Sequence, residues 1–101
     1  SPENPKIFLK GHTSLFVVCG SQEIMNTFRP VLEIYNEGDS LLSTTENSYF
    51  KKIPDTSDEY IELFFQAEQT FKGKIVVRFN KKNKKNKILS GQINLLIIVL
   101  V

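Results

Sequence analysis

The chain contains one cysteine, Cys19, and one histidine, His12, so its stock of nucleophilic and metal-binding side chains is small. A cysteine nucleophile needs a base close by, and only His12 offers an imidazole. Cys19 closes the apolar run "SLFVVC", which predicts a small buried hydrophobic residue instead. A single cysteine forms no internal disulfide, and with a single histidine it cannot complete a structural zinc site.

Four carboxylates lie close together along the chain, at Asp55, Asp58, Glu59 and Glu62. Two carboxylates share acid and base roles, as in glycosidases, when one lies in an apolar pocket and the other in a polar setting. Nothing in the surrounding sequence marks such a pocket. We therefore interpret these residues as charges of a loop and of a strand edge, and keep a small carboxylate enzyme only as a third hypothesis.

The segment "NEGDS" at 36–40 carries several oxygen-bearing side chains, but the distal glutamate of a calcium-binding loop is missing. This segment predicts a solvated turn. No glycine-rich phosphate loop precedes a helix anywhere in the chain. We therefore expect no catalytic residue, no metal site and no cofactor, and a non-enzymatic function.

The stretch "NKKNKKNK" at 80–87 has the highest charge density of the chain. The formal net charge is +2, and without these five lysines the 13 basic residues fall to eight against 11 acidic ones. Lysine lacks the planar fork that reads bases, and no aromatic residue is interleaved for stacking. We expect a hairpin tip here and consider nucleic acid an unlikely partner. The alternative is a polyanion-binding site made of Lys81, Lys82, Lys84, Lys85 and Lys87.

Apolar residues recur mostly with a period of two along the chain, which is typical of β-strands. Its 101 residues correspond to a single domain, 1–101. Short apolar runs separated by turn residues predict an all-β fold. The expected fold is an Ig-like β-sandwich of about seven antiparallel strands with at most one short helix. The expected strands are 6–10, 14–20, 31–36, 48–53, 60–67, 74–80 and 87–101, where the last segment could hold one long strand or two.

The clearest alternation lies in "YIELFFQA" and "KIVVRFN", which we expect to form one hairpin with "FKGK" as its turn. One face of this hairpin is predicted to be buried as a core, while Phe64 lies on the opposite face, with Tyr60, Glu62 and Gln66. The predicted core residues are Ile61, Leu63, Phe65, Ile75, Val77 and Phe79.

Two segments allow a helix as well as a strand. Residues 21–28 contain good helix formers between a possible serine cap and Pro30. Residues 58–70 follow a capping-box pattern, Thr56 with Glu59, but also fit a strand. For 58–70 we favour the strand.

The two ends of the chain carry different signals. Residues 1–5 contain two prolines and resemble a linker, so we expect the chain to be a fragment of a larger protein. The final segment "INLLIIVLV" is shorter than the ~20 apolar residues of a membrane-spanning helix. We expect it to complete a sheet rather than to anchor the chain in a membrane.

The segment "FKGKIVVRFN", the Lys/Asn-rich stretch and "LSGQINLL" together resemble Ig-like β-sandwich modules of Bacteroidota. Such modules occur in large secreted or cell-surface proteins, and some accompany type VI secretion effectors. The chain lacks the cysteine pair and the tryptophan of antibody-type domains. The resemblance implies a spacer or protein-interaction module, secreted or at the bacterial cell surface. Its implied partners are other domains of the same polypeptide or another protein.

Overall fold

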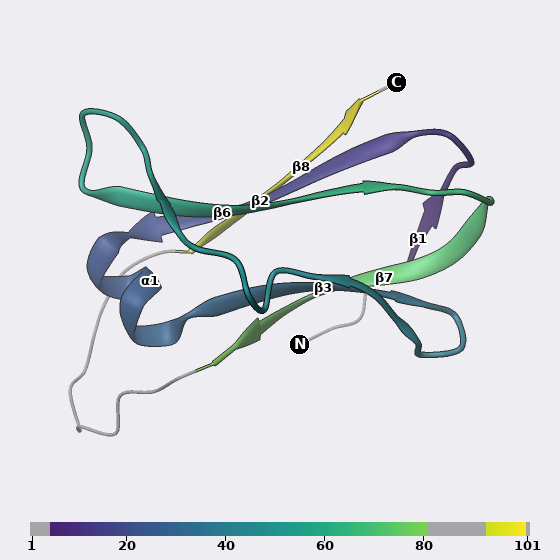
Figure 1. Cartoon of the computed structure of the whole chain (residues 1–101), viewed down its shortest axis with the longest axis horizontal. Coiled ribbons are helices and arrows are strands. Elements are labelled where there is room, and N and C mark those ends of the chain that lie inside the picture. Colours follow the sequence, from purple (N-terminus) through teal and green to yellow (C-terminus); the bar gives the residue numbers. More distant parts are fainter. Residues whose placement is uncertain (1–4, 81–92, 101) are drawn as a thin grey trace.

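A computed structural model describes residues 5–80 and 93–100 of the chain, which form eight strands and one helix (Figure 1). The elements in chain order are β1 (Pro5–Phe8), β2 (Thr13–Ser21), α1 (Gln22–Phe28), β3 (Pro30–Asn36), β4 (Leu41–Thr44), β5 (Lys51–Lys52), β6 (Asp58–Gln66), β7 (Phe71–Phe79) and β8 (Asn94–Leu100).

The strands form two four-stranded sheets, and all the strand pairs are antiparallel. Sheet A has the order β1-β7-β3-β4, and sheet B has the order β5-β6-β2-β8. Figure 1 shows them as two layers, with β3 and β7 in one and β2 and β6 in the other. The predicted all-β sandwich is confirmed. The short strand β4 was not predicted, because "LLST" shows no alternation.

The C-terminal apolar segment pairs with β2 along Thr13–Cys19, so the prediction that it completes a sheet is confirmed. Residues 58–66 are a strand, as favoured, and no helix of the described residues has the length and apolarity needed to cross a membrane. The helix that the sequence left open at 21–28 is α1. Ser21 caps it by accepting a hydrogen bond from Ile24 N, and Arg29 ends it in the left-handed conformation, at φ 50°.

The predicted hairpin between β6 and β7 is wrong, because the two strands belong to different sheets. The segment 67–70 crosses from sheet B to sheet A, next to the β1–β2 connection, and Gly11 N donates to Ala67 O at 2.8 Å. The Phe65 and Phe71 rings meet edge to face between the sheets, with centroids 6.0 Å apart. One ring comes from each sheet, so this contact fills the space between the sheets where the chain changes from one to the other.

The supposed turn "FKGK" lies inside β7. A Cβ atom on Gly73 would lie 2.5 Å from Tyr35 O and 2.6 Å from the Phe71 ring, closer than atoms approach without movement. Because Gly73 has no side chain, it leaves room for the Tyr35 carbonyl of β3 and for the Phe71 ring of its own strand. It does not mark a turn. β7 and β8 lie in different sheets and do not form a hairpin with each other, while the hairpin tip predicted at 80–87 lies outside the described residues from 81 on.

The core lies between the sheets and includes side chains of both and of α1. Ile61 and Leu63 are buried as predicted, and Phe65, Ile75 and Val77 are half-buried against the core. Phe79 was predicted wrongly, since it is 46% exposed. At the end of β7 its ring meets Phe28 of α1, with centroids 5.9 Å apart, and remains at the margin of the core. The buried core residues are Phe8, Phe16, Val18, Met25, Leu32, Ile34, Ile61, Leu63 and Ala67.

Candidate interaction surface

Lys81, Lys82, Lys84, Lys85 and Lys87 lie outside the described residues. The polyanion hypothesis that rests on them stays a prediction.

Cys19 and His12 lie near opposite ends of β2. His12 directly precedes β2, and Cys19 lies seven residues further along, so roughly 23 Å separates them on an extended strand. Cys19 is half-buried on the outer face of sheet B, between Tyr60 and Asn94 in register, and is not part of the core that the sequence predicted for it. The two residues do not form a thiol–imidazole pair.

The four candidate carboxylates are divided between a turn and the two faces of β6. Asp55 lies in the turn before β6, at φ 61°. Glu59 is buried on the inner side of the strand, where Asn26 Nδ2 donates to it at 3.4 Å, while Asp58 and Glu62 lie on the opposite face. Glu62 pairs with Lys51 at 3.3 Å. These carboxylates therefore do not converge on one pocket.

The segment 36–40 forms the turn between β3 and β4, as predicted. Asn36 Oδ1 accepts a hydrogen bond from Ser40 N at 2.9 Å, and Asp39 adopts φ 61° and pairs with Lys74 at 2.8 Å. Among the described residues, no group of three or more His, Cys, Asp or Glu side chains is arranged to hold a metal ion.

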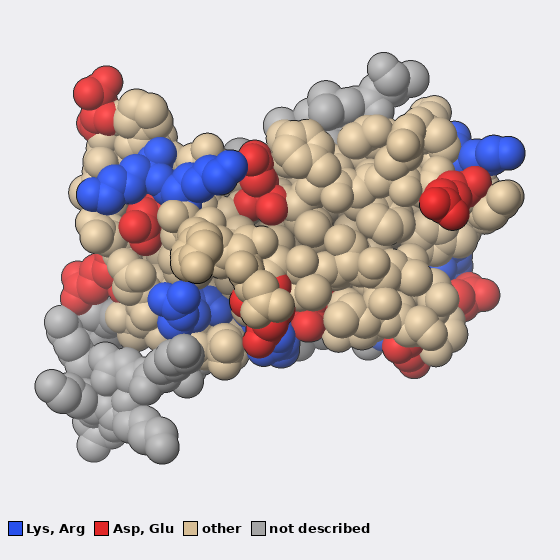
Figure 2. Space-filling view, in the orientation of Figure 1, with Lys and Arg blue, Asp and Glu red and all other residues tan. Residues whose placement is uncertain are grey.

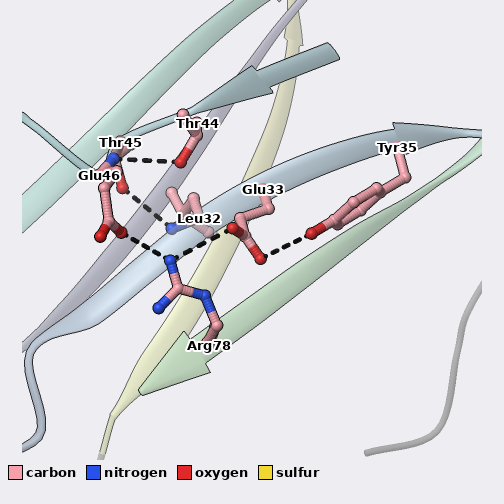
Figure 3. A network of polar contacts seen from close by, with 7 residues as sticks. All are labelled: Leu32, Glu33, Tyr35, Thr44, Thr45, Glu46 and Arg78. Carbon is pink, nitrogen blue, oxygen red and sulfur yellow. Dashed lines mark hydrogen bonds and ion pairs between the residues drawn. The ribbon is translucent and has the colours of Figure 1, made fainter. Parts of the chain in front are cut away.

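A polar network that sequence patterns did not reveal lies on the outer face of sheet A (Figure 3). Arg78 Nη2 lies 3.3 Å from Glu33 Oε2 and 2.6 Å from Glu46 Oε2, and the Tyr35 hydroxyl donates to Glu33 Oε1 at 3.0 Å. Glu33 is buried although it is charged, and these two donors compensate the loss of water.

The same network fixes the chain where it leaves β4. The buried Thr45 exchanges hydrogen bonds with Leu32, accepting at Oγ1 and donating from its backbone N. The hydrogen bond to Glu33 raises the pKa of the Tyr35 phenol, and hydrogen bonds to Glu33 and then Glu46 raise the pKa of Arg78. All these groups bind one another, so we assign the network a role in stability.

The most distinctive surface feature is an open edge of sheet B. On the side away from β2, β5 pairs with β6 only at Glu59 and Tyr60, and no other strand of the described residues pairs there. Ala67 exchanges backbone hydrogen bonds with Gly11 and His12 on the β2 side, while Asp58 O accepts from Ile53 on the β5 side.

Because backbone groups alternate sides along a strand, the alternate residues Glu62, Phe64 and Gln66 direct their N–H and C=O groups toward the open side. These six backbone groups have the arrangement that an added strand would pair with. We call residues 62–66 the open edge.

A hollow of about 490 Å³ lies next to the open edge, between the margins of the two sheets. Leu42, Phe65 and Phe71 supply its apolar wall, and its polar lining includes Gln66, Glu68 and Gln69. In Figure 1 the connection from β4 to β6 passes in front of both layers, and on this same side Figure 2 shows a broad area with few charged side chains.

Two large apolar side chains near the open edge are exposed: Leu42 by 42% and Phe64 by 56%. Phe64 lies on the outer face of sheet B, opposite Leu15 in register. The sequence carried a signal for this site, since Phe64 is an aromatic residue on the polar face of its strand. It gave no signal for the open edge, because it predicted residues 74–80 as the partner of 60–67 and a strand at 48–53 that is longer than β5.

No family model matches this chain, and comparison with the curated proteins and with the solved structures found no match either.

Proposed function

We propose that this chain is a non-enzymatic, Ig-like β-sandwich module of a larger bacterial protein. It serves as a spacer that also binds a protein partner, either another domain of the same polypeptide or a separate protein. We further propose that the larger protein is secreted or lies at the cell surface, in the manner of modules that accompany secretion effectors.

The observation that carries this proposal is the open edge next to the apolar hollow. Six backbone groups lie at the margin of sheet B, with exposed apolar side chains above and beside them. Proteins usually protect such an edge with lysine, proline, a bulge or a covering loop. Residues 62–66 contain neither lysine nor proline. A surface of this kind favours binding of another chain.

A photocross-linking experiment in cells that produce the full-length protein tests this function. One variant carries p-benzoylphenylalanine in place of Phe64, and the matched control carries it in place of Tyr49, which is 89% exposed in the loop before β5. We expect position 64 to give one defined adduct, either to a neighbouring domain or to a second protein, and position 49 to give none. No adduct at 64, or equal adducts at both positions, contradicts the proposal.

A further inference from the structure

The open edge is short and bounded at both ends. β5 occupies the position opposite Tyr60, and at Ala67 the chain turns toward sheet A. About five residues remain between these limits, or roughly 17 Å of strand. A gap of this length between β5 and the corner matches one short extended segment.

We propose that the open edge binds an extended peptide segment of the partner as an additional strand of sheet B. The N–H and C=O groups of Glu62, Phe64 and Gln66 pair with the backbone of this segment. This proposal rests on the interaction function above and names the chemistry of its partner. Binding by strand addition obtains its affinity from main-chain hydrogen bonds and its specificity from pockets for alternate side chains.

The hollow determines which side chains the bound segment carries. Successive side chains of a strand point to opposite faces of a sheet, so every second side chain of a strand added beside β6 points between the two sheets. There it meets the wall formed by Leu42, Phe65 and Phe71. The partner segment therefore carries apolar side chains at alternate positions, while the intervening ones lie beside Phe64 on the outer face.

The charge of the hollow's lining favours a further kind of side chain in the bound peptide segment. Glu68 is the one charged side chain among the described residues that line the hollow, and the lining contains no lysine or arginine. Glu62 of the open edge lies on the outer face and already pairs with Lys51, so it does not add to the charge of the hollow. A basic residue next to the apolar positions therefore complements this site, and an acidic one opposes it.

The first test uses a synthetic peptide library and the 101-residue chain. The peptides have lysine at both ends, a mixture of Val, Leu, Ile and Phe at the third and fifth of seven positions, and threonine elsewhere. We expect the library to bind more tightly than a second library in which aspartate replaces the terminal lysines. Absence of binding, or equal binding of the two libraries, overturns the proposal.

N-methylation of the peptides identifies main-chain pairing directly. One set is methylated at the even-numbered amides and the other at the odd-numbered amides. Only one of these two sets of N–H groups faces β6 in an added strand, so we expect one set to lose about tenfold or more in affinity and the other to keep it. If both sets behave alike, the peptide does not bind as a strand.

Two pairs of protein variants test where the peptide binds. Phe64→Pro removes the N–H donor at the centre of the open edge, whereas Phe64→Thr keeps it, and this N–H is not used in the β2 ladder. Leu42→Lys places a cation at the hollow, whereas Leu41→Lys changes a similarly exposed neighbour that does not line it. We expect Phe64→Pro to lose more binding than Phe64→Thr, and Leu42→Lys to lose more than Leu41→Lys, with cooperative unfolding retained in all four. Equal effects within either pair overturn the proposed position.

The outcomes separate this proposal from the interaction function. A cross-link at position 64 without peptide binding leaves the interaction function in place and overturns the strand addition. Absence of both contradicts the two proposals together.

Discussion

Arg78 on β7 binds the buried carboxylate of Glu33 on the neighbouring strand β3, with 3.3 Å between Nη2 and Oε2. The same guanidinium binds Glu46, which lies in the segment after β4, so one side chain connects three parts of sheet A and its margin. The two carboxylates differ in their surroundings. The side chain of Glu33 is 9% exposed and that of Glu46 is 41% exposed.

This difference predicts unequal effects of mutation. Arg78→Met leaves the Glu33 carboxylate buried with one donor, Tyr35, and we expect it to lower the free energy of unfolding by about 1–3 kcal/mol. Glu46→Gln removes an exposed charge and should cost less than about 1 kcal/mol. Urea unfolding of both variants measures the difference. Equal losses would show that Glu33 does not depend on Arg78.

The adjacent residues Phe64 and Phe65 provide a matched test of which face of β6 is buried. Phe65 packs against the core between the sheets, so Phe65→Ala should cost about 3 kcal/mol. Phe64 is on the outer face, and Phe64→Ala should change the free energy of unfolding by about 0.5 kcal/mol. Thermal or urea unfolding of the two variants gives the comparison. A larger loss for Phe64→Ala would reverse the assignment of the faces.

Because of the hydrogen bond from Tyr35 to Glu33, we expect the free energy of unfolding to decrease as the pH rises into the alkaline range. The pKa of Tyr35 is raised in the folded state above its ordinary value of 10.0, so folding favours the protonated phenol. This contribution is complete below the unfolded pKa and is lost as the pH rises through the folded pKa. Stability should therefore fall less steeply above pH 10.0 in Tyr35→Phe than in the parent chain. Tyr49→Phe, which changes an exposed tyrosine, is the control and should follow the parent.

The strand β8 should be necessary for folding. It pairs with β2 along Thr13–Cys19, and β2 has buried residues at every second position. Deleting Asn94–Leu100 would leave the backbone groups of β2 on that side without partners, and buried groups in that condition cost free energy. We expect the shortened chain to show no cooperative unfolding transition by circular dichroism. A shortened chain that still unfolds cooperatively would disprove this.

A prediction about the lysine-rich segment separates the polyanion hypothesis from the interaction function. Replacement of Lys81, Lys82, Lys84, Lys85 and Lys87 by serine should change stability by about 0.5 kcal/mol or less at each position. Binding of the parent to duplex DNA should be weak and should fall with salt, with a slope near 0.9 per phosphate contact. A salt titration of both chains measures this. Submicromolar binding that survives roughly 200 mM salt and disappears in the serine variant would favour the polyanion function.

The sequence alone determined much of the local structure. A period of two in the apolar residues identified β6 and β7, because a strand with one buried face must alternate. The short apolar run at 14–20 identified β2, and the strand-forming residues at 31–36 identified β3. Ser21 before a run of helix formers allowed α1, because its hydroxyl accepts a backbone N–H at the start of the helix. The turn at 36–40 followed from the preference of Asn, Gly and Asp for such conformations.

Only the tertiary structure decided which strands are neighbours. Alternation shows which residues share a face, but strands of both sheets have the same alternation, so it does not identify the partner of a strand. Where the chain crosses from β6 to β7, Phe65 of one sheet packs against Phe71 of the other, a contact between sheets that alternation does not reveal. Glu33 and Arg78 are 45 residues apart, and only the pairing of β3 with β7 brings them together. The open edge exists because β5 starts at Lys51, opposite Tyr60, and does not extend along residues 62–66. The length of β5 is set by its pairing in space rather than by the sequence of β6.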